Sequence, residues 1–351
     1  MKFIIFGLFM IISIESHSQS REDYDFNELN ELILQKFGDD FEFSVLIEVN
    51  NLQIYSDNYM KSETLHPEED SNHKLYNIAS ITKSITAVGI MKLVEVEEIS
   101  LSDTLGMFFK GIPHPKGSIT ISNLLSHKSG LPQSYPLSGI SESAEALNLI
   151  LNQQLEFDPG TGFRYSNQNY QLLALIIEKV SQIPFEDFIR KTVLYPLKMN
   201  NTIFWDETNE NMNIANLNDR VKSLIGKRNW GFNGGVGMFS TTSDLFKFWN
   251  GIYKDGFLSR RSINLMFQPY HKTNSGTEVG LGFFKSPETK WNQQVLWTRG
   301  TESWGHNSAI SYYSEKDVTI IVLTASGEID NDRNKTGNRL ISDLIATFLF
   351  D

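Results

Sequence analysis

The sequence contains no cysteine. This absence excludes a disulfide framework and a lipid-modified cysteine at a processed N-terminus, so export of the chain would not depend on oxidation. The seven histidines are scattered and show no spacing typical of metal ligands. The sequence therefore gives no reason to expect a metal site.

Basic residues are the scarcer of the two charged classes. Lysine and arginine number 31 against 42 acidic residues, which gives a formal net charge of -11. Nucleic acids and anionic membrane surfaces select basic patches, so neither is expected as a main partner. A hydrophobic content of 40% with 12% aromatics is enough for a substantial core. The 351 residues allow two domains, or one large domain with an insertion.

The apolar run at residues 3–14 is too short to span a bilayer. It follows Lys2 and is typical of the apolar region of a secretory signal, with Ser18 and Ser20 as small residues at the cleavage site. We therefore predict a signal peptide at residues 1–20 and an exported protein, periplasmic or secreted. No stable membrane span is expected after cleavage. An N-terminal anchor and a buried first helix are the alternatives.

Apolar periodicity divides the chain into three parts. Helical spacing predicts helices at 25–37, 119–127, 143–151, 169–182, 185–194, 242–253, 259–267 and 340–349. Alternating or β-rich runs predict strands at 43–49, 52–59, 279–284, 294–298, 309–313 and 318–324. Strands at both ends and a mainly helical middle, about 100–230, predict a sheet built from both termini with a helical insertion. Residues 21–351 would form this one domain. No element is predicted for 201–227.

Ser80 and Lys83 begin a long apolar helix pattern and lie one turn apart on one helix face. A lysine that burial keeps neutral can take the proton of a serine hydroxyl and so make it nucleophilic. This spacing is common by chance, however. Taken alone, it is explained as well by a serine near a helix cap and a solvated lysine.

Tyr165 and Asn167 lie before a predicted helix and can face the same way on an extended segment. A tyrosine near lysines can have its pKa lowered enough to shuttle protons, and an asparagine can bond both a lysine and a substrate amide. The alternative is a buried aromatic followed by a helix cap. A third stretch, residues 304–309, opens a predicted strand, where His306 could carry a proton and the Ala309 N–H could point into a cleft. A structural histidine at a strand edge is the alternative there.

In this order the three stretches resemble the S-x-x-K, Y-x-N and K/H-x-G motifs of serine β-lactamases and penicillin-binding proteins, in the class C-like branch. The resemblance runs from about residue 43 to the C-terminus and includes residues 124–132 and 233–237. It implies an α/β (α+β) fold of the β-lactamase/transpeptidase type. In that fold an antiparallel sheet flanked by helices lies beside an all-helical region, with the site between them.

The resemblance also implies the chemistry. Ser80 would attack a carbonyl, Lys83 and Tyr165 would move its proton to the leaving group, and water would release the acyl group, without metal or cofactor. The N–H groups of Ser80 and Ala309 would form the oxyanion hole, and Asn167 would hold the lysine and the substrate amide. The expected substrate is a small molecule or peptide with an amide or ester bond, such as a D-amino-acid peptide, a cell-wall fragment, a small ester or, weakly, a β-lactam. The alternative is a non-catalytic binding or sensor protein that keeps this fold. The substrate-binding and oxyanion residues implied are Asn167, His306, Asn307, Ser308 and Ala309.

The chain departs from the family pattern in its third motif. Ser308 stands where the family usually has glycine and is expected to crowd the substrate strand, while His306 in place of lysine is more typical of esterases and D-amino-acid peptidases. The literal Lys-Thr-Gly at 335–337 is interpreted as a helix entry. The glycines of 233–237 are expected to allow close backbone approach beside the site rather than to bind phosphate. His127 is expected to pack under the site.

Overall fold

The structure is a computed structural model that describes residues 24–38, 41–59, 74–133, 139–217, 222–287, 291–302, 305–325 and 336–351. The predicted signal peptide, Trp304 and Lys335 lie outside these residues. In the described part, no helix is both long enough and apolar enough to cross a membrane.

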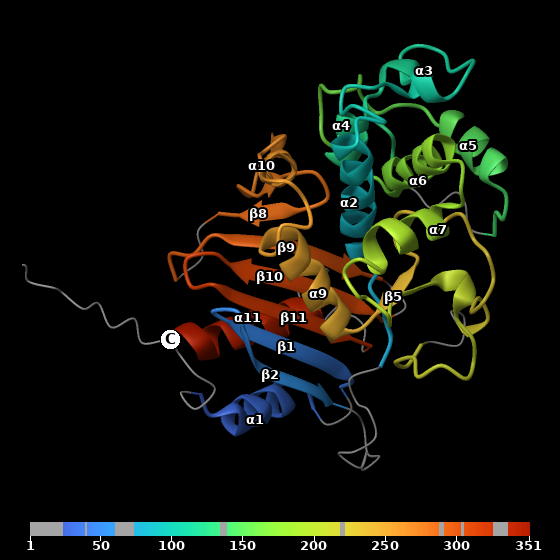
Figure 1. The fold of residues 1–351 in the computed structure, drawn as a ribbon. Helices are drawn as coiled ribbons and strands as arrows, with labels where there is room; N and C mark the ends of the chain where they lie inside the picture. The colour runs from blue at the N-terminus through green and yellow to red at the C-terminus, as the bar shows by residue number, and fades with distance from the viewer. Residues whose placement is uncertain are drawn as a thin grey trace, which may run out of the picture.

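Eight strands form one antiparallel sheet that joins the two ends of the chain (Figure 1). They lie in the order β2-β1-β11-β10-β9-β8-β7-β6. Their bounds are β1 (Phe43–Val49), β2 (Leu52–Tyr59), β6 (His271–Lys272), β7 (Glu278–Val279), β8 (Phe284–Ser286), β9 (Val295–Thr301), β10 (Asn307–Tyr313) and β11 (Val318–Thr324). Pairing of β1 with β11 closes the N-terminal hairpin onto the C-terminal one, which confirms the predicted sheet.

Side-chain alternation in the central strands supplies two cores. Ile320 and Val322 of β11 face one core with α1 (Phe26–Phe37) and α11 (Gly337–Phe350), whereas Ile321 and Leu323 face the other. The second core contains α2 (Ile81–Glu95), α9 (Thr242–Tyr253) and α10 (Arg260–Phe267). The predicted strand 279–284 is two short strands, since Gly282 has a φ of +81° and breaks the extended backbone.

The helical region contains short helices and a small sheet. The helices are α3 (Leu105–Phe108), α4 (Ile121–Leu125), α5 (Ser143–Leu151), α6 (Asn167–Ser181) and α7 (Phe185–Ile189), with a π-turn at Arg190–Leu194 and 3-10 turns at Lys116–Ser118 and Trp205–Glu207. The small sheet has the order β3 (Tyr76–Asn77), β5 (Met238–Ser240), β4 (Ile203–Phe204). Strand β4 lies in the segment for which no element was predicted, and two residues are too few to show a period.

Helix α2 stands between the main sheet and the helical region (Figure 1). It is buried nearly all round, and its polar residues Thr82, Lys83, Ser84 and Thr86 lie inside with the apolar ones. Ser84 Oγ lies 2.7 Å from Thr298 Oγ1 of β9, which ties the helix to the sheet. A helix that is enclosed in this way can hold a polar site between the two halves.

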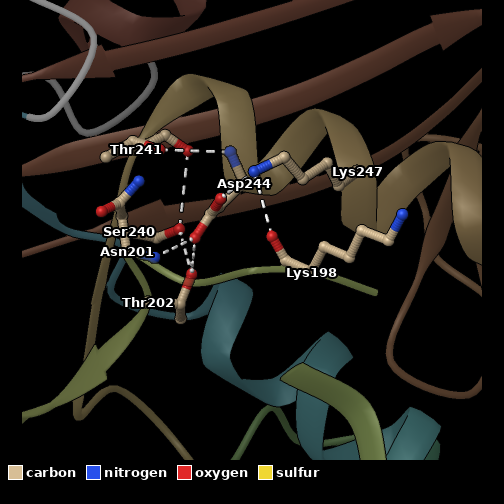
Figure 2. Close-up of polar contacts among 7 residues, drawn as sticks. All are labelled: Lys198, Asn201, Thr202, Ser240, Thr241, Asp244 and Lys247. Atoms are coloured by element: carbon tan, nitrogen blue, oxygen red, sulfur yellow. Dashed lines mark hydrogen bonds and ion pairs between the residues drawn. The ribbon is translucent and has the colours of Figure 1, made fainter. Parts of the chain in front are cut away.

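A buried carboxylate anchors α9 to the chain before β4 (Figure 2). Asp244 is fully buried, and it accepts hydrogen bonds from the backbone N–H of Asn201 at 2.7 Å and from Thr202 Oγ1 at 3.0 Å. Lys247 Nζ lies 2.7 Å from the other carboxylate oxygen. Since a buried carboxylate is stable only when it is hydrogen-bonded, this cluster depends on the Asn201 and Thr202 donors more than on the partly exposed Lys247.

We predict that Asp244→Ala lowers the free energy of unfolding by about 3 kcal/mol, because it leaves buried donors unsatisfied. Urea unfolding measures this. The matched control is Lys247→Ala, whose side chain is 37% exposed and should contribute less than about 1 kcal/mol. Equal losses from the two variants would contradict the anchoring role.

Candidate active site

A strained turn places Ser80 at the start of α2. The preceding residue, Ala79, has a left-handed φ of +46°, which costs a non-glycine residue roughly 1 kcal/mol. Asn77 stabilises the turn, because its Oδ1 accepts the Ala79 N–H at 3.1 Å while its Nδ2 donates to Val236 O and Met238 O. The Ser80 side chain makes no cap hydrogen bond to its own helix. Its hydroxyl is therefore available to neighbouring side chains.

Lys83 lies within hydrogen-bond reach of that hydroxyl. Its Nζ is 3.0 Å from Ser80 Oγ and 2.9 Å from Gly235 O, and the side chain is 3% exposed. Burial lowers the pKa of Lys83 to about 7, against an opposing effect of the Glu302 charge. At neutral pH a large share of this amine is unprotonated and can accept the serine proton.

Glycines let a backbone loop reach the lysine. A Cβ on Gly234, whose φ is +69°, would lie 2.2 Å from Tyr170 O, and a Cβ on Gly235 would lie 3.7 Å from Lys83 Nζ. The predicted close backbone approach beside the site is confirmed. Gly235 contributes the carbonyl that holds the amine.

Tyr165 is the second side chain, after Lys83, that contacts the Ser80 hydroxyl. Its phenol is hydrogen-bonded to Ser80, and Lys83 Nζ is 5.2 Å from its ring centroid. Burial raises the pKa of Tyr165 well above its ordinary value, and the Ser80 hydrogen bond offsets only part of the rise. The prediction of a lowered pKa was wrong, because desolvation of the buried phenol outweighs the hydrogen bond to Ser80. Tyr165 keeps its proton and can donate it.

Asn167 does not make the predicted contact with Lys83. It is the first residue of α6 and is 2% exposed, and its Oδ1 has no hydrogen-bond partner among the described residues. The amine is held by the Gly235 carbonyl instead. A role for Asn167 toward a substrate amide stays a prediction.

A cavity of about 370 Å³ opens at Ser80. It is lined by Ser80, Lys83, His127, Phe163, Tyr165, Tyr170, Gly282, Phe284, Trp297, Thr298, Arg299 and Thr301. Helices and loops of the helical region supply one wall, and strand β9 with Gly282 and Phe284 at the start of β8 supplies the other. Its aromatic rings give the cavity an apolar lining suited to a substrate with an apolar group.

Strand β9, and not β10, borders this cavity, so the predicted place of the third motif was wrong. Ala309 of β10 pairs with Arg299 of β9 on one side and with Val322 of β11 on the other. Its backbone lies inside the sheet and has no open side toward the cleft. Ala309 therefore cannot supply the oxyanion N–H.

Thr301 at the end of β9 is placed to supply that N–H. Strand β8 pairs with β9 only as far as Trp297, so among the described residues β9 has no strand partner on this side from Thr298 to Thr301. Glu302 donates its N–H to His306 O across the β9–β10 ladder. Because bonded pairs alternate along an antiparallel ladder, the Thr301 N–H points away from β10, toward the open side.

Gly300 takes the place that the resemblance gave to a glycine at 308. A Cβ on Gly300 would lie 2.4 Å from Ile78 O and 2.7 Å from Ala79 Cβ, which are the residues just before Ser80. Ser308 lies one strand further in, and its Oγ donates to Ile78 O at 2.6 Å, so it does not crowd the cavity. The signal for Thr298-Arg299-Gly300 was a glycine just beyond the predicted strand 294–298; it was missed because neither lysine nor histidine opens the triplet.

His306 is a structural residue. It is fully buried; its Nδ1 accepts the Asn77 N–H at 2.8 Å and its Nε2 lies 3.0 Å from Asn216 O. Burial lowers the pKa of His306 to about 4. His306 does not line the cavity, so the expected roles as a proton carrier and as a substrate-binding residue were wrong, and the structural alternative holds. Asn307, also fully buried, bonds Gly305 O and does not line the cavity.

Thr336 and Gly337 of the literal Lys-Thr-Gly do not line the cavity at Ser80. Thr336 is the N-cap of α11 and Gly337 its first residue, as the helix-entry interpretation predicted. In the described part of the chain, no cluster of three histidine, aspartate or glutamate side chains is arranged to hold a metal ion.

The sequence of this chain is similar to one protein family model and to individual proteins of known sequence. The sequence matches the family model described as Beta-lactamase over residues 49–343. Penicillin-binding protein 4* of Bacillus subtilis (strain 168) is 27% identical over 302 residues, which are 78% of this chain and 66% of that protein. Protein flp of Staphylococcus aureus (strain MRSA252) is 31% identical over 184 residues, 49% of this chain and 36% of that protein. The match therefore spans less than two thirds of the length of either relative.

Solved structures share the fold. The octameric penicillin-binding protein homologue from Pyrococcus abyssi superposes with a TM-score of 0.76 at 24% identity, covering 93% of this chain and 77% of that one. D-amino acid amidase from Ochrobactrum anthropi SV3, complexed with L-phenylalanine, gives 0.74 at 20% identity, covering 93% of this chain and 99% of that one. A D-stereospecific amidohydrolase from Streptomyces sp. gives 0.73 at 17% identity, covering 92% and 98%. The predicted fold class is confirmed.

The protonation of Lys83 predicts a pH dependence. With a pKa of about 7 the amine is protonated below that value and neutral above it. The rate at which a fluorophosphonate modifies Ser80 should rise about tenfold per pH unit below 7 and level off above it. Lys83→Met should react slowly at every pH. A parent rate that is constant between pH 5 and 8 would show that Lys83 is not the base.

The packing of Gly300 predicts that β9, and not β10, positions the backbone before Ser80. Gly300→Ala adds a methyl group against the backbone before Ser80 and should slow fluorophosphonate modification at least about tenfold, since small misplacements have large effects on reactivity. Ser308→Ala is the control: it removes one hydrogen bond from β10 and should change the rate less. If Gly300→Ala reacts as fast as the parent, β9 does not define the site.

Proposed function

The chain belongs to the Beta-lactamase family, and from that membership we propose that it is a serine hydrolase that forms an acyl-enzyme on Ser80. The observation that carries the proposal is the buried Lys83 amine, 3.0 Å from Ser80 Oγ and with its pKa lowered to about 7, at the base of a cavity. The resemblance seen in the sequence pointed to the same family.

In the first step, Ser80 Oγ attacks the carbonyl carbon of an amide or ester while its proton passes to Lys83 Nζ. The carbonyl π electrons move to the oxygen, and the resulting oxyanion lies between the N–H groups of Ser80 and Thr301. Such donors are worth ~3 kcal/mol each in comparable sites. The helix N-terminus adds positive potential at the same position.

In the second step, the tetrahedral adduct collapses and the bond to the leaving group breaks. Tyr165 keeps its proton at neutral pH and donates it to the leaving amine or alkoxide, and the Lys83 ammonium returns a proton to the phenolate. Water then attacks the acyl-enzyme, with Tyr165 and Lys83 moving protons in the reverse sense. The cycle restores the free Ser80 hydroxyl and needs no cofactor.

The substrate that we propose is a small amide or ester, such as a D-amino-acid amide or a short D-peptide with an apolar side chain. The aromatic lining of the 370 Å³ cavity supports an apolar group. Two structural neighbours are named for D-amino acid amidase and D-stereospecific amidohydrolase activity, which supports this class. Cell-wall fragments also belong to the proposed substrate class, and β-lactams would be turned over weakly. We also propose export after removal of residues 1–20.

The sequence feature that would favour the alternative, a non-catalytic binding or sensor protein, is Ser308 in place of the glycine of the third motif. Ser308 lies away from the cavity, and Gly300 occupies the tight position instead. The structural argument for the alternative is therefore removed, and it becomes an outcome of the substrate test.

Intact-mass spectrometry tests the nucleophile. We expect a one-to-one adduct after exposure of the parent to a fluorophosphonate and, more slowly, to a penicillin, because both acylate or phosphonylate an activated serine. Ser80→Ala should give neither adduct. Adduct formation that survives the substitution would show that the nucleophile is another residue.

A substrate panel then separates the two functions. Chromogenic esters, D-alanyl and D-phenylalanyl amides with their L-isomers, and a cephalosporin are compared by initial rate. Turnover of D-amides or esters supports the proposed class. Formation of the Ser80 adduct without turnover of any member would favour the binding role.

A further inference from the structure

His127 lies directly beside the proposed catalytic groups. It follows α4 with a left-handed φ of +59°, is 2% exposed, and lines the cavity with Ser80 and Lys83. The sequence led us to expect only packing under the site. Its contacts show a more specific arrangement.

His127 contacts the segment 164–166 at three points. Its backbone C=O accepts the Arg164 N–H at 2.9 Å, and its Nδ1 accepts the Ser166 N–H at 3.2 Å. Between these two hydrogen bonds its ring stacks on the Tyr165 ring, with centroids 4.3 Å apart and planes 29° apart. One residue thus holds the backbone on both sides of Tyr165 and the face of its ring.

The imidazole is held uncharged. Nδ1 must be unprotonated to accept the Ser166 N–H, and Asn169 Nδ2 lies 3.3 Å from the same atom. Burial and the charge of Lys83 lower the pKa of His127 to about 3. The His127 ring therefore has no part in proton transfer at neutral pH. It also places no positive charge beside the Lys83 amine.

We propose that His127 is the positioning residue of this site, which fixes the Tyr165 phenol against Ser80 through its ring and Nδ1. The inference rests on the proposed role of Tyr165 and goes beyond it. This position needs a flat side chain that can stack on Tyr165 and that tolerates a left-handed backbone. The side chain must also carry a hydrogen-bond acceptor next to the atom that joins the ring to Cβ. Histidine combines these properties.

Two variants separate the contacts. His127→Asn keeps an acceptor near the place of Nδ1 and tolerates the left-handed backbone, but it loses the ring. His127→Phe keeps the ring and leaves the Ser166 N–H unsatisfied. We expect each to lower the rate of fluorophosphonate modification of Ser80 about tenfold. With D-phenylalanine p-nitroanilide, kcat should fall and KM should change little.

A double-mutant cycle with Tyr165→Phe decides between positioning and general support of the fold. If His127 acts through the phenol, His127→Asn should slow modification less than twofold in the Tyr165→Phe background, against tenfold in the parent. An equal factor in both backgrounds, or no effect in the parent, would overturn the inference. Urea unfolding midpoints show that the compared proteins are folded.

A measurement on the unaltered chain gives a second test, should the variants fail to fold. With ¹⁵N-labelled histidine, Nδ1 of His127 should be unprotonated from pH 5 to 8, as its bond to Ser166 requires. A protonated Nδ1 in that range would overturn the inference. If the parent itself forms no Ser80 adduct, the proposed function fails; if it does and the His127 variants react at the parent rate, only the present inference fails.

Discussion

The structure depends on a buried lysine amine that is partly uncharged at neutral pH. Lys83 Nζ sits between Ser80 Oγ and the Gly235 carbonyl, at 3.0 and 2.9 Å. Both partners are neutral, and the charge of Glu302 opposes the effect of burial only in part, so the pKa of the amine is lowered to about 7. This requires a helix enclosed on all sides and a glycine loop that can approach its first turn. The sheet and the helical region supply that enclosure together, which explains why the site lies where they meet.

The two halves contribute different parts of the same cavity. The helical region supplies Tyr165, with His127 stacked against it, while β9 supplies the open edge at Thr301. At neutral pH the Tyr165 phenol stays protonated while part of the Lys83 amine is unprotonated, which gives the site one donor and one acceptor. Such a pair can pass a proton from nucleophile to leaving group without free acid or base.

His306, just before β10, and Gly300 of β9 show that the place of a residue in the sheet determines whether it contributes to the site. His306 has a side chain well suited to proton transfer, yet it is enclosed and bonds Asn77 and Asn216 through both ring nitrogens. His306 accepts the Asn77 N–H, and Asn77 in turn stabilises the turn before Ser80. Gly300 contributes by having no side chain, because only then can the strand lie against Ile78 and Ala79.

Local sequence pattern was enough for most of the long helices and strands and for the pair Ser80 and Lys83. Alternation and helical periodicity predicted β1, β2, β11 and α9 with their observed bounds, and the spacing of Ser80 and Lys83 placed both on one helix face, because these features depend on neighbours along the chain. Three things depended on the tertiary structure: which strand forms the edge of the cleft, which carbonyl holds the lysine, and in which direction burial shifts the pKa of Tyr165. Strand order and desolvation arise from contacts between residues that are far apart in the chain, and no local pattern records them.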